Sequence, residues 1–127
     1  MRVAGFGFRA GTTPAALAEA LQRAGGRAGL QALATAEDKV DHPAFQSFVQ
    51  ALALPLIAIP VSLIAAAPAD LSPHAPSRYG GRGLAEAAAL AAAGAGATLV
   101  ARRATSTDKT ATAAIAATGA IDEGAMP

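Results

Sequence analysis

Residues 3–14 read VAGFGFRAGTTP, and this segment predicts the start of an alternating α/β domain. A short apolar run leads into a glycine-rich turn that carries Arg9 and two threonine hydroxyls. A helix is then expected to begin at Pro14, with Thr13 as its N-cap. The strand, the loop and the helix N-terminus with its unpaired N–H groups together form an edge that attracts anions.

The composition indicates one globular domain. The chain has 127 residues, of which 53% are hydrophobic, 15% charged and 4% aromatic, which is enough apolar mass for a proper core. Ten basic and nine acidic residues leave a net charge of +1, so nucleic-acid binding is not expected. Because the chain has no cysteine and only two histidines, we expect no disulfide, no metal site and no cofactor.

The uncharged stretch of residues 44–69 is long enough for a membrane span. Pro55 and Pro60 interrupt it, and polar side chains dilute it. We therefore expect a buried helix, a strand and a second helix in series, in a soluble cytoplasmic protein without a membrane partner.

Apolar spacing predicts the helices. The first covers residues 14–24, and the second opens at Asp41 and Pro43. In that second helix the apolar residues recur at helical spacing, as Phe45, Phe48, Val49 and Leu52. A short helix is expected over residues 61–66 and a longer one over residues 84–93.

The strands are expected over residues 30–35, 56–59, 98–101 and 110–116, in addition to the first, with residues 56–59 fully buried. Only eight residues, 102–109, separate the last two strands. That is too short for a parallel crossover, so these two strands form an antiparallel hairpin at a sheet edge.

We therefore predict one three-layer α/β/α domain over residues 1–117, with a mostly parallel sheet of about five strands. A flexible tail is expected over residues 118–127. The Pro-, Ser- and Gly-rich segment 68–83 is expected to be a functional loop.

Basic and hydroxyl side chains follow the predicted strand ends, where ligands bind in sheets of this kind. Half of the ten basic residues are expected at this edge, namely Arg9, Lys39, Arg102, Arg103 and Lys109. The hydroxyl donors expected there are Thr12, Thr13, Thr35, Ser106 and Thr110. Such an edge suits a small molecule that carries several carboxylates or phosphates.

Several of these features also have a purely structural explanation. The glycines of the first loop either relieve backbone crowding or admit a ligand, and their spacing fits neither a dinucleotide fingerprint nor a P-loop. Lys39 is either a ligand-binding residue or a solvated turn residue, and Arg103 is explained by edge-strand protection. Glu86 complements a helix dipole and His42 caps a helix, in their simplest interpretations.

Four segments, in this order, resemble one family. They are GFGFRAGTT (5–13), ATAEDK (34–39), GLAEAAA (83–89) and KTATA (109–113). The chain resembles the CobE family of cobalamin (vitamin B12) biosynthesis, which is similar to the C-terminal domain of CbiG. The resemblance implies a role around the ring-contraction stage of corrin synthesis, with a precorrin or corrinoid ligand that bears many acetate and propionate arms.

The resemblance also implies site residues, which we combine with those inferred from the strand ends. The expected ligand-binding residues are Arg9, Gly11, Thr12, Thr35, Lys39, Arg102, Ser106, Lys109 and Thr110. The candidate catalytic residues are Lys39 and Glu86. Phe8 stands where many relatives carry cysteine, which argues against a thiol-based mechanism, and Arg102 stands where lysine is common.

Three functions fit these observations. The first is a protein that binds a precorrin intermediate and holds it or passes it on. The second is a hydrolase that opens a precorrin lactone or removes an acyl fragment, with Lys39 or Glu86 assisting water and Arg9 stabilising the oxyanion. The third is a module that docks on another cobalamin biosynthesis enzyme through the loop 68–83.

Overall fold

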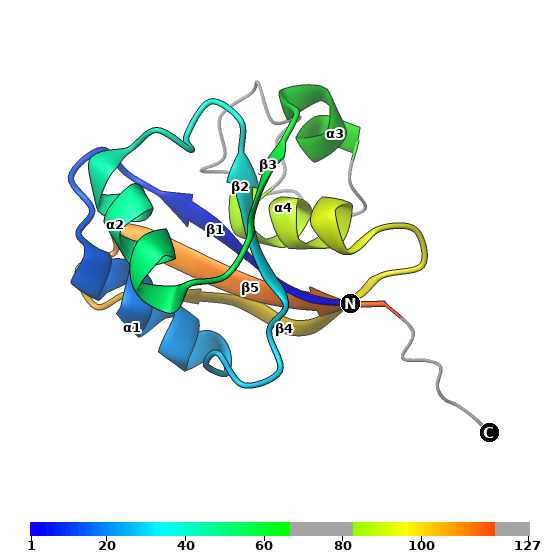
Figure 1. The fold of residues 1–127 in the computed structure, drawn as a ribbon, viewed down its shortest axis with the longest axis horizontal. Coiled ribbons are helices and arrows are strands. Elements are labelled where there is room, and N and C mark those ends of the chain that lie inside the picture. The colour runs from blue at the N-terminus through cyan, green and yellow to red at the C-terminus, as the bar shows by residue number, and fades with distance from the viewer. Residues whose placement is uncertain (67–82, 119–127) are drawn as a thin grey trace.

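The computed structural model describes residues 1–66 and 83–118, in which helices cover both faces of one five-stranded sheet (Figure 1). The strands are β1 (Arg2–Phe8), β2 (Ala32–Ala36), β3 (Leu56–Ile59), β4 (Thr98–Thr105) and β5 (Ala111–Ala117). The helices are α1 (Pro14–Ala24), α2 (Pro43–Leu52), α3 (Val61–Ala66) and α4 (Leu84–Ala93). Apart from Gly83 and Thr118, the predicted loop 68–83 and tail 118–127 lie outside the described residues. Thr118 donates its N–H to Met1 O at 3.0 Å.

The sheet has the strand order β3-β2-β1-β5-β4. β1, β2 and β3 are parallel, whereas β5 runs antiparallel to both of its neighbours, β1 and β4. β4 therefore points in the same direction as β1, and only β5 is reversed. The predicted α/β class and C-terminal hairpin are confirmed, and the carboxyl ends of β1 to β4 meet the start of β5 at one edge.

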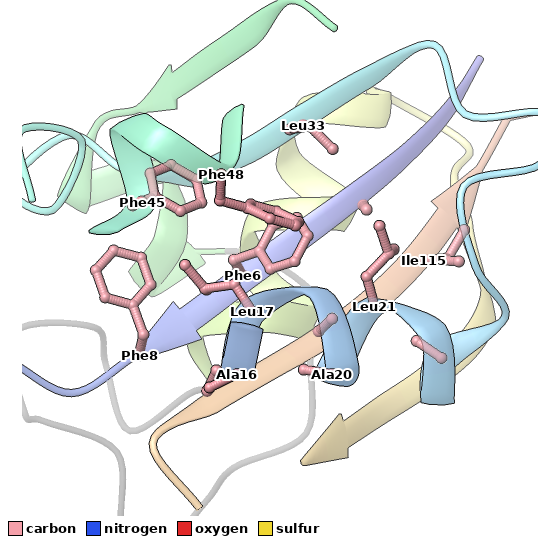
Figure 2. Packing of buried hydrophobic residues seen from close by; sticks show 14 of the residues in the cluster. Phe6, Phe8, Ala16, Leu17, Ala20, Leu21, Leu33, Phe45, Phe48 and Ile115 are labelled. Atoms are coloured by element: carbon pink, nitrogen blue, oxygen red, sulfur yellow. The ribbon is translucent and has the colours of Figure 1, made fainter. Parts of the chain in front are cut away.

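One face of the sheet carries the aromatic core, packed under α1 and α2 (Figure 2). Alternate residues of β1 point to this face because side chains alternate along a strand. The ring of Phe6 lies 5.2 Å from that of Phe48, edge to face, and 5.8 Å from that of Phe45. The helix predicted from the spacing of Phe45 and Phe48 is confirmed, and the structure shows that both rings pack against Phe6 of β1.

On the opposite face of β1, Gly5 and Gly7 have no side chains, and this leaves room for α4 to lie directly on the strand. A Cβ at Gly5 would lie 2.2 Å from Ala85 O and 2.5 Å from Ala89 N. A Cβ at Gly7 would lie 3.3 Å from the Leu84 Cβ. Both glycines belong to β1 and relieve crowding, and the connection that follows the strand begins only at Arg9.

Two strand predictions are corrected by the topology. The segment 56–59 is not fully buried, since β3 is an edge strand with only Ile59 buried. β4 continues to Thr105 because it pairs with β5 as far as Thr105 and Thr112, with two irregularities on the way. Arg102 therefore lies within β4 and not after it.

Other differences are small. β2 begins at Ala32, since Leu30 still belongs to a turn with Arg27. α2 begins at Pro43, and its N-cap is His42, in agreement with the capping interpretation. No helix in residues 1–66 and 83–118 has the length and apolar character needed to cross a lipid bilayer.

Candidate functional site

Three connections meet at the carboxyl edge of the sheet, and we call this surface the rim: residues 9–12, 37–42 and 106–110. Arg9 N donates to Thr110 O at 2.8 Å, which joins the first connection to the hairpin turn. Lys39 Nζ donates to Phe8 O at 2.8 Å, which joins the second connection to the last residue of β1, directly before the first connection. The backbone thus brings Arg9, Lys39 and Lys109 to a single edge, although they are far apart in the sequence.

Lys39 is half-buried, and its ammonium group is held in place. Besides its bond to Phe8 O, Nζ lies 5.1 Å from the centre of the Phe8 ring. A cation above an aromatic face is attracted by the ring quadrupole. The aromatic residue at position 8 therefore supports the charge of Lys39 at the rim.

His42 fastens two parts of the rim at once. Its Nδ1 accepts a hydrogen bond from Ala44 N at 3.2 Å and so caps α2. The ring proton must then be on Nε2, which lies 2.7 Å from Ala10 O and donates to it. The geometry agrees with the capping interpretation of His42.

Two hydroxyl groups of the hairpin turn, those of Ser106 and Thr110, donate hydrogen bonds to Asp108. Ser106 Oγ and Thr110 Oγ1 donate to Asp108 Oδ1 at 2.7 and 2.8 Å, and Thr110 N donates at 3.0 Å. The Ser106 hydroxyl first, and then the two groups of Thr110, hold the pKa of Asp108 below its ordinary value. Since Thr110 gives its proton to Asp108, the Thr12 hydroxyl donates to Thr110 Oγ1 at 3.0 Å.

Apart from Thr13, whose hydroxyl oxygen accepts from Ala16 N at 3.1 Å as the N-cap of α1, the predicted hydroxyl donors already donate within the protein. Thr35 is fully buried and donates to Phe6 O at 2.8 Å, which ties β2 to β1. Ser106 is also buried. Gly11 is exposed, and a Cβ there would meet nothing within 4 Å. Donors toward an anion at the rim must come chiefly from the basic side chains.

Glu86 and the arginines of β4 lie apart from the three basic residues of the rim. Glu86 is 3% exposed, and its Oε2 accepts from Arg103 N at 3.1 Å. A Cβ at Gly83 would lie 2.5 Å from Arg103 Nη1, so the Arg103 guanidinium covers the start of α4. Strand register places Arg102 between the levels of Ala4 and Phe6, back from the rim.

A profile of the family described as "Cobalamin synthesis G C-terminus" matches residues 2–116. The chain belongs to this family. No curated protein matches it.

Two solved structures are similar to this CbiG C-terminal chain. The first is the crystal structure of CobE, a protein from the cobalamin (vitamin B12) biosynthetic pathway. Its sequence is 31% identical to this chain, the TM-score is 0.73, and the match covers 91% of this chain and 89% of that one. The cobalamin biosynthesis protein chiG from Agrobacterium tumefaciens strain C58 is 34% identical with a TM-score of 0.69, and the match covers 94% of this chain and 99% of that one. The predicted resemblance is confirmed, and the chain is a cobalamin biosynthesis protein.

The rim of this CbiG C-terminal domain is not uniformly positive. Glu37, Asp38 and Asp41 lie in its second connection and Asp108 in its third. Glu37 Oε2 accepts from Val61 N at 3.0 Å and thus faces the N-terminus of α3, and Asp108 is surrounded by donors. Arg9 and Lys109 have exposed side chains, and each is the one basic residue of its connection.

Sequence reasoning missed Asp108, Thr107 and the α1 pair Glu19 and Arg23. The order Ser-Thr-Asp-Lys is typical of a turn in which the Asp side chain accepts local N–H bonds. This signal would have found Asp108. The spacing of Glu19 and Arg23 predicts an ion pair on one helix face, but nothing local indicates that this pair binds Thr107. Within the described residues, no cluster of His, Asp and Glu has the arrangement of a metal site.

Proposed function

We propose that this protein binds a precorrin or corrinoid intermediate at the rim, around the ring-contraction stage of cobalamin biosynthesis. The observation that carries the proposal is the meeting of Arg9, Lys39 and Lys109 at one edge through hydrogen bonds between their connections. A ligand with several acetate and propionate arms needs separated cations that it can reach at the same time. An Arg guanidinium binds a carboxylate in two parallel hydrogen bonds, and a Lys ammonium acts as a compact charge.

Helix N-termini add to this preference for anions. α1 and α2 both begin at the rim, directly after the connections that carry Arg9 and Lys39. Each helix N-terminus carries a partial positive charge from its unpaired N–H groups. The rim therefore favours carboxylates even where acidic side chains lie nearby.

Spectral titration with cobyrinic acid, a corrinoid whose arms are free acids, tests the proposal. We expect Arg9→Met and Lys109→Met each to weaken binding by about threefold to tenfold, because each removes one charged hydrogen-bond donor. Arg27→Met is the matched control, since Arg27 is exposed in the connection from α1 to β2, at the opposite edge of the sheet. We expect its affinity to be unchanged.

Two further comparisons sharpen this experiment. Cobinamide, whose ring arms are amides, is expected to bind far more weakly than cobyrinic acid if charge drives recognition. Intermediates from before and after ring contraction, titrated in parallel, test the stage. The proposal would be contradicted if Arg27→Met and Lys109→Met lost the same affinity for cobyrinic acid, or if the wild-type protein bound cobyrinic acid and cobinamide equally well.

The geometry gives the hydrolase alternative less support than binding. Lys39 Nζ donates to a backbone carbonyl, and the buried Glu86 carboxylate accepts from a backbone N–H. These contacts give both groups structural roles. Equal product formation by wild type and Lys39→Ala, incubated with a precorrin lactone, would remove Lys39 from any such mechanism.

A further inference from the structure

The tip of the β4–β5 hairpin is joined to α1 by a polar cluster in which Thr107 of the rim binds two side chains of the helix. Glu19 Oε1 accepts from Thr107 N at 3.1 Å, and Glu19 Oε2 accepts from the Thr107 hydroxyl. Arg23 donates from Nη2 to Thr107 Oγ1 at 2.9 Å and from Nη1 to Thr105 O at 3.0 Å. Arg23 and Glu19 also form an ion pair, with 3.0 Å between Nη2 and Oε2. Thr107 is therefore held by both members of the pair.

An exposed pair of this spacing on one helix contributes little to stability by itself. Its two members are unusual because both also bind the hairpin, which lies more than eighty residues away in the chain. The Thr107 hydroxyl, followed by the Thr107 N–H, holds the pKa of Glu19 below its ordinary value. The cluster thus serves the position of the hairpin tip more than the helix.

Lys109 lies in the turn between this cluster at Thr107 and a second set of hydrogen bonds at Thr110. On its other side, Thr110 is bonded to Asp108, to Thr12 and to the N–H of Arg9. The backbone of Lys109 is left-handed, with φ at 64°. Glycine is the ordinary residue at such a position in a hairpin turn, because it has no Cβ to be strained there. A lysine at this position is held in a conformation that favours glycine, and the hydrogen bonds of Thr107 and Thr110 on either side hold the turn there.

We propose that Glu19, Arg23 and Thr107 are positioning residues that direct Lys109 toward the ligand of the rim. This inference rests on the proposed function. The ligand does not touch the cluster; the cluster fixes the turn before binding, so that Lys109 is presented without an ordering cost at the moment of association.

A double-mutant cycle with cobyrinic acid as the probe tests the inference. We expect Thr107→Val to weaken binding by about threefold, because two hydrogen bonds that order the turn are lost. In the Lys109→Met background, Thr107→Val is expected to have no further effect, since the side chain that it positions is gone. Thr107→Ser keeps the hydroxyl and should retain the wild-type affinity. Thr98→Val, at an exposed site near the far end of β4, is the matched control.

Glu19→Gln is the second variant, and thermal melts verify that each variant is folded. It keeps the shape of Glu19 but replaces one acceptor oxygen by an NH2 donor and removes the ion pair with Arg23, so its effect on binding should also depend on Lys109. Equal loss of affinity with and without Lys109, or no loss in wild-type background, overturns this inference alone. Failure of the wild-type protein to bind cobyrinic acid overturns the proposed function and this inference with it.

Discussion

At the scale of single residues, Gly5 and Gly11 belong to the same opening segment but have opposite surroundings. We expect Gly5→Ala to destabilise the protein by about 2–3 kcal/mol or more, because the new methyl group would overlap the α4 backbone at Ala85 and Ala89. Gly11→Ala should change stability by less than about 1 kcal/mol, since its Cβ meets nothing within 4 Å. Urea denaturation of both variants measures the difference. Similar midpoints for the two would mean that α4 does not lie against β1 as described.

At the scale of elements, the β4–β5 hairpin depends on an ionised Asp108. Hydrogen bonds from Ser106 and Thr110 hold the pKa of Asp108 below its ordinary value, so its contribution to stability is fully present above about pH 4. That contribution is lost as the pH falls through the lower pKa of the folded state. We expect Asp108→Asn to flatten the decline in stability that begins below about pH 4. A residual decline remains, because the pKa of Glu19 is also lowered.

Chemical denaturation across that pH range measures this effect, with Asp41→Asn as the control. Asp41 is an exposed rim aspartate outside the hairpin, so its replacement should leave the slope unchanged. A wild-type slope in Asp108→Asn, or a flattened slope in Asp41→Asn, would show that the hairpin is not held by the Asp108 carboxylate.

Elements with strong local signals were predictable from the sequence, and their partners were not. Pro14, the Phe45 and Phe48 spacing and the short β4–β5 connection each predict an element or its direction correctly. The exposure of β3 depends on where the chain goes next: β5 and β4 are added on the other side of β1, so among the described residues no strand pairs with the outer edge of β3. In the same way, the basic residues of the rim follow from strand ends, whereas the bond between Thr12 and Thr110 spans 98 residues.

At the scale of the whole molecule, the direction of the strands determines where the rim forms. Because β4 points the same way as β1 and β5 is reversed, the hairpin turn reaches the edge where α1 and α2 begin. One turn and two βα connections thereby contribute basic residues to the same surface. The net charge of the chain is only +1, and the rim holds four acidic side chains beside its three lysine and arginine side chains. The proposed attraction for a polyacid must therefore come from the placement of individual cations and not from a surplus of positive charge.

Binding through a few placed cations leads to a prediction about salt. Raising the NaCl concentration from about 0.05 M to about 0.5 M shortens the screening length severalfold, so we expect cobyrinic acid to bind at least about threefold more weakly. Titrations at several salt concentrations give the slope. Lys109→Met should reduce that slope, whereas Arg27→Met should keep it, because Arg27 lies at the other edge of the sheet. Affinity that is constant or rises with salt would assign binding to apolar contacts, since salt strengthens these and screens charges.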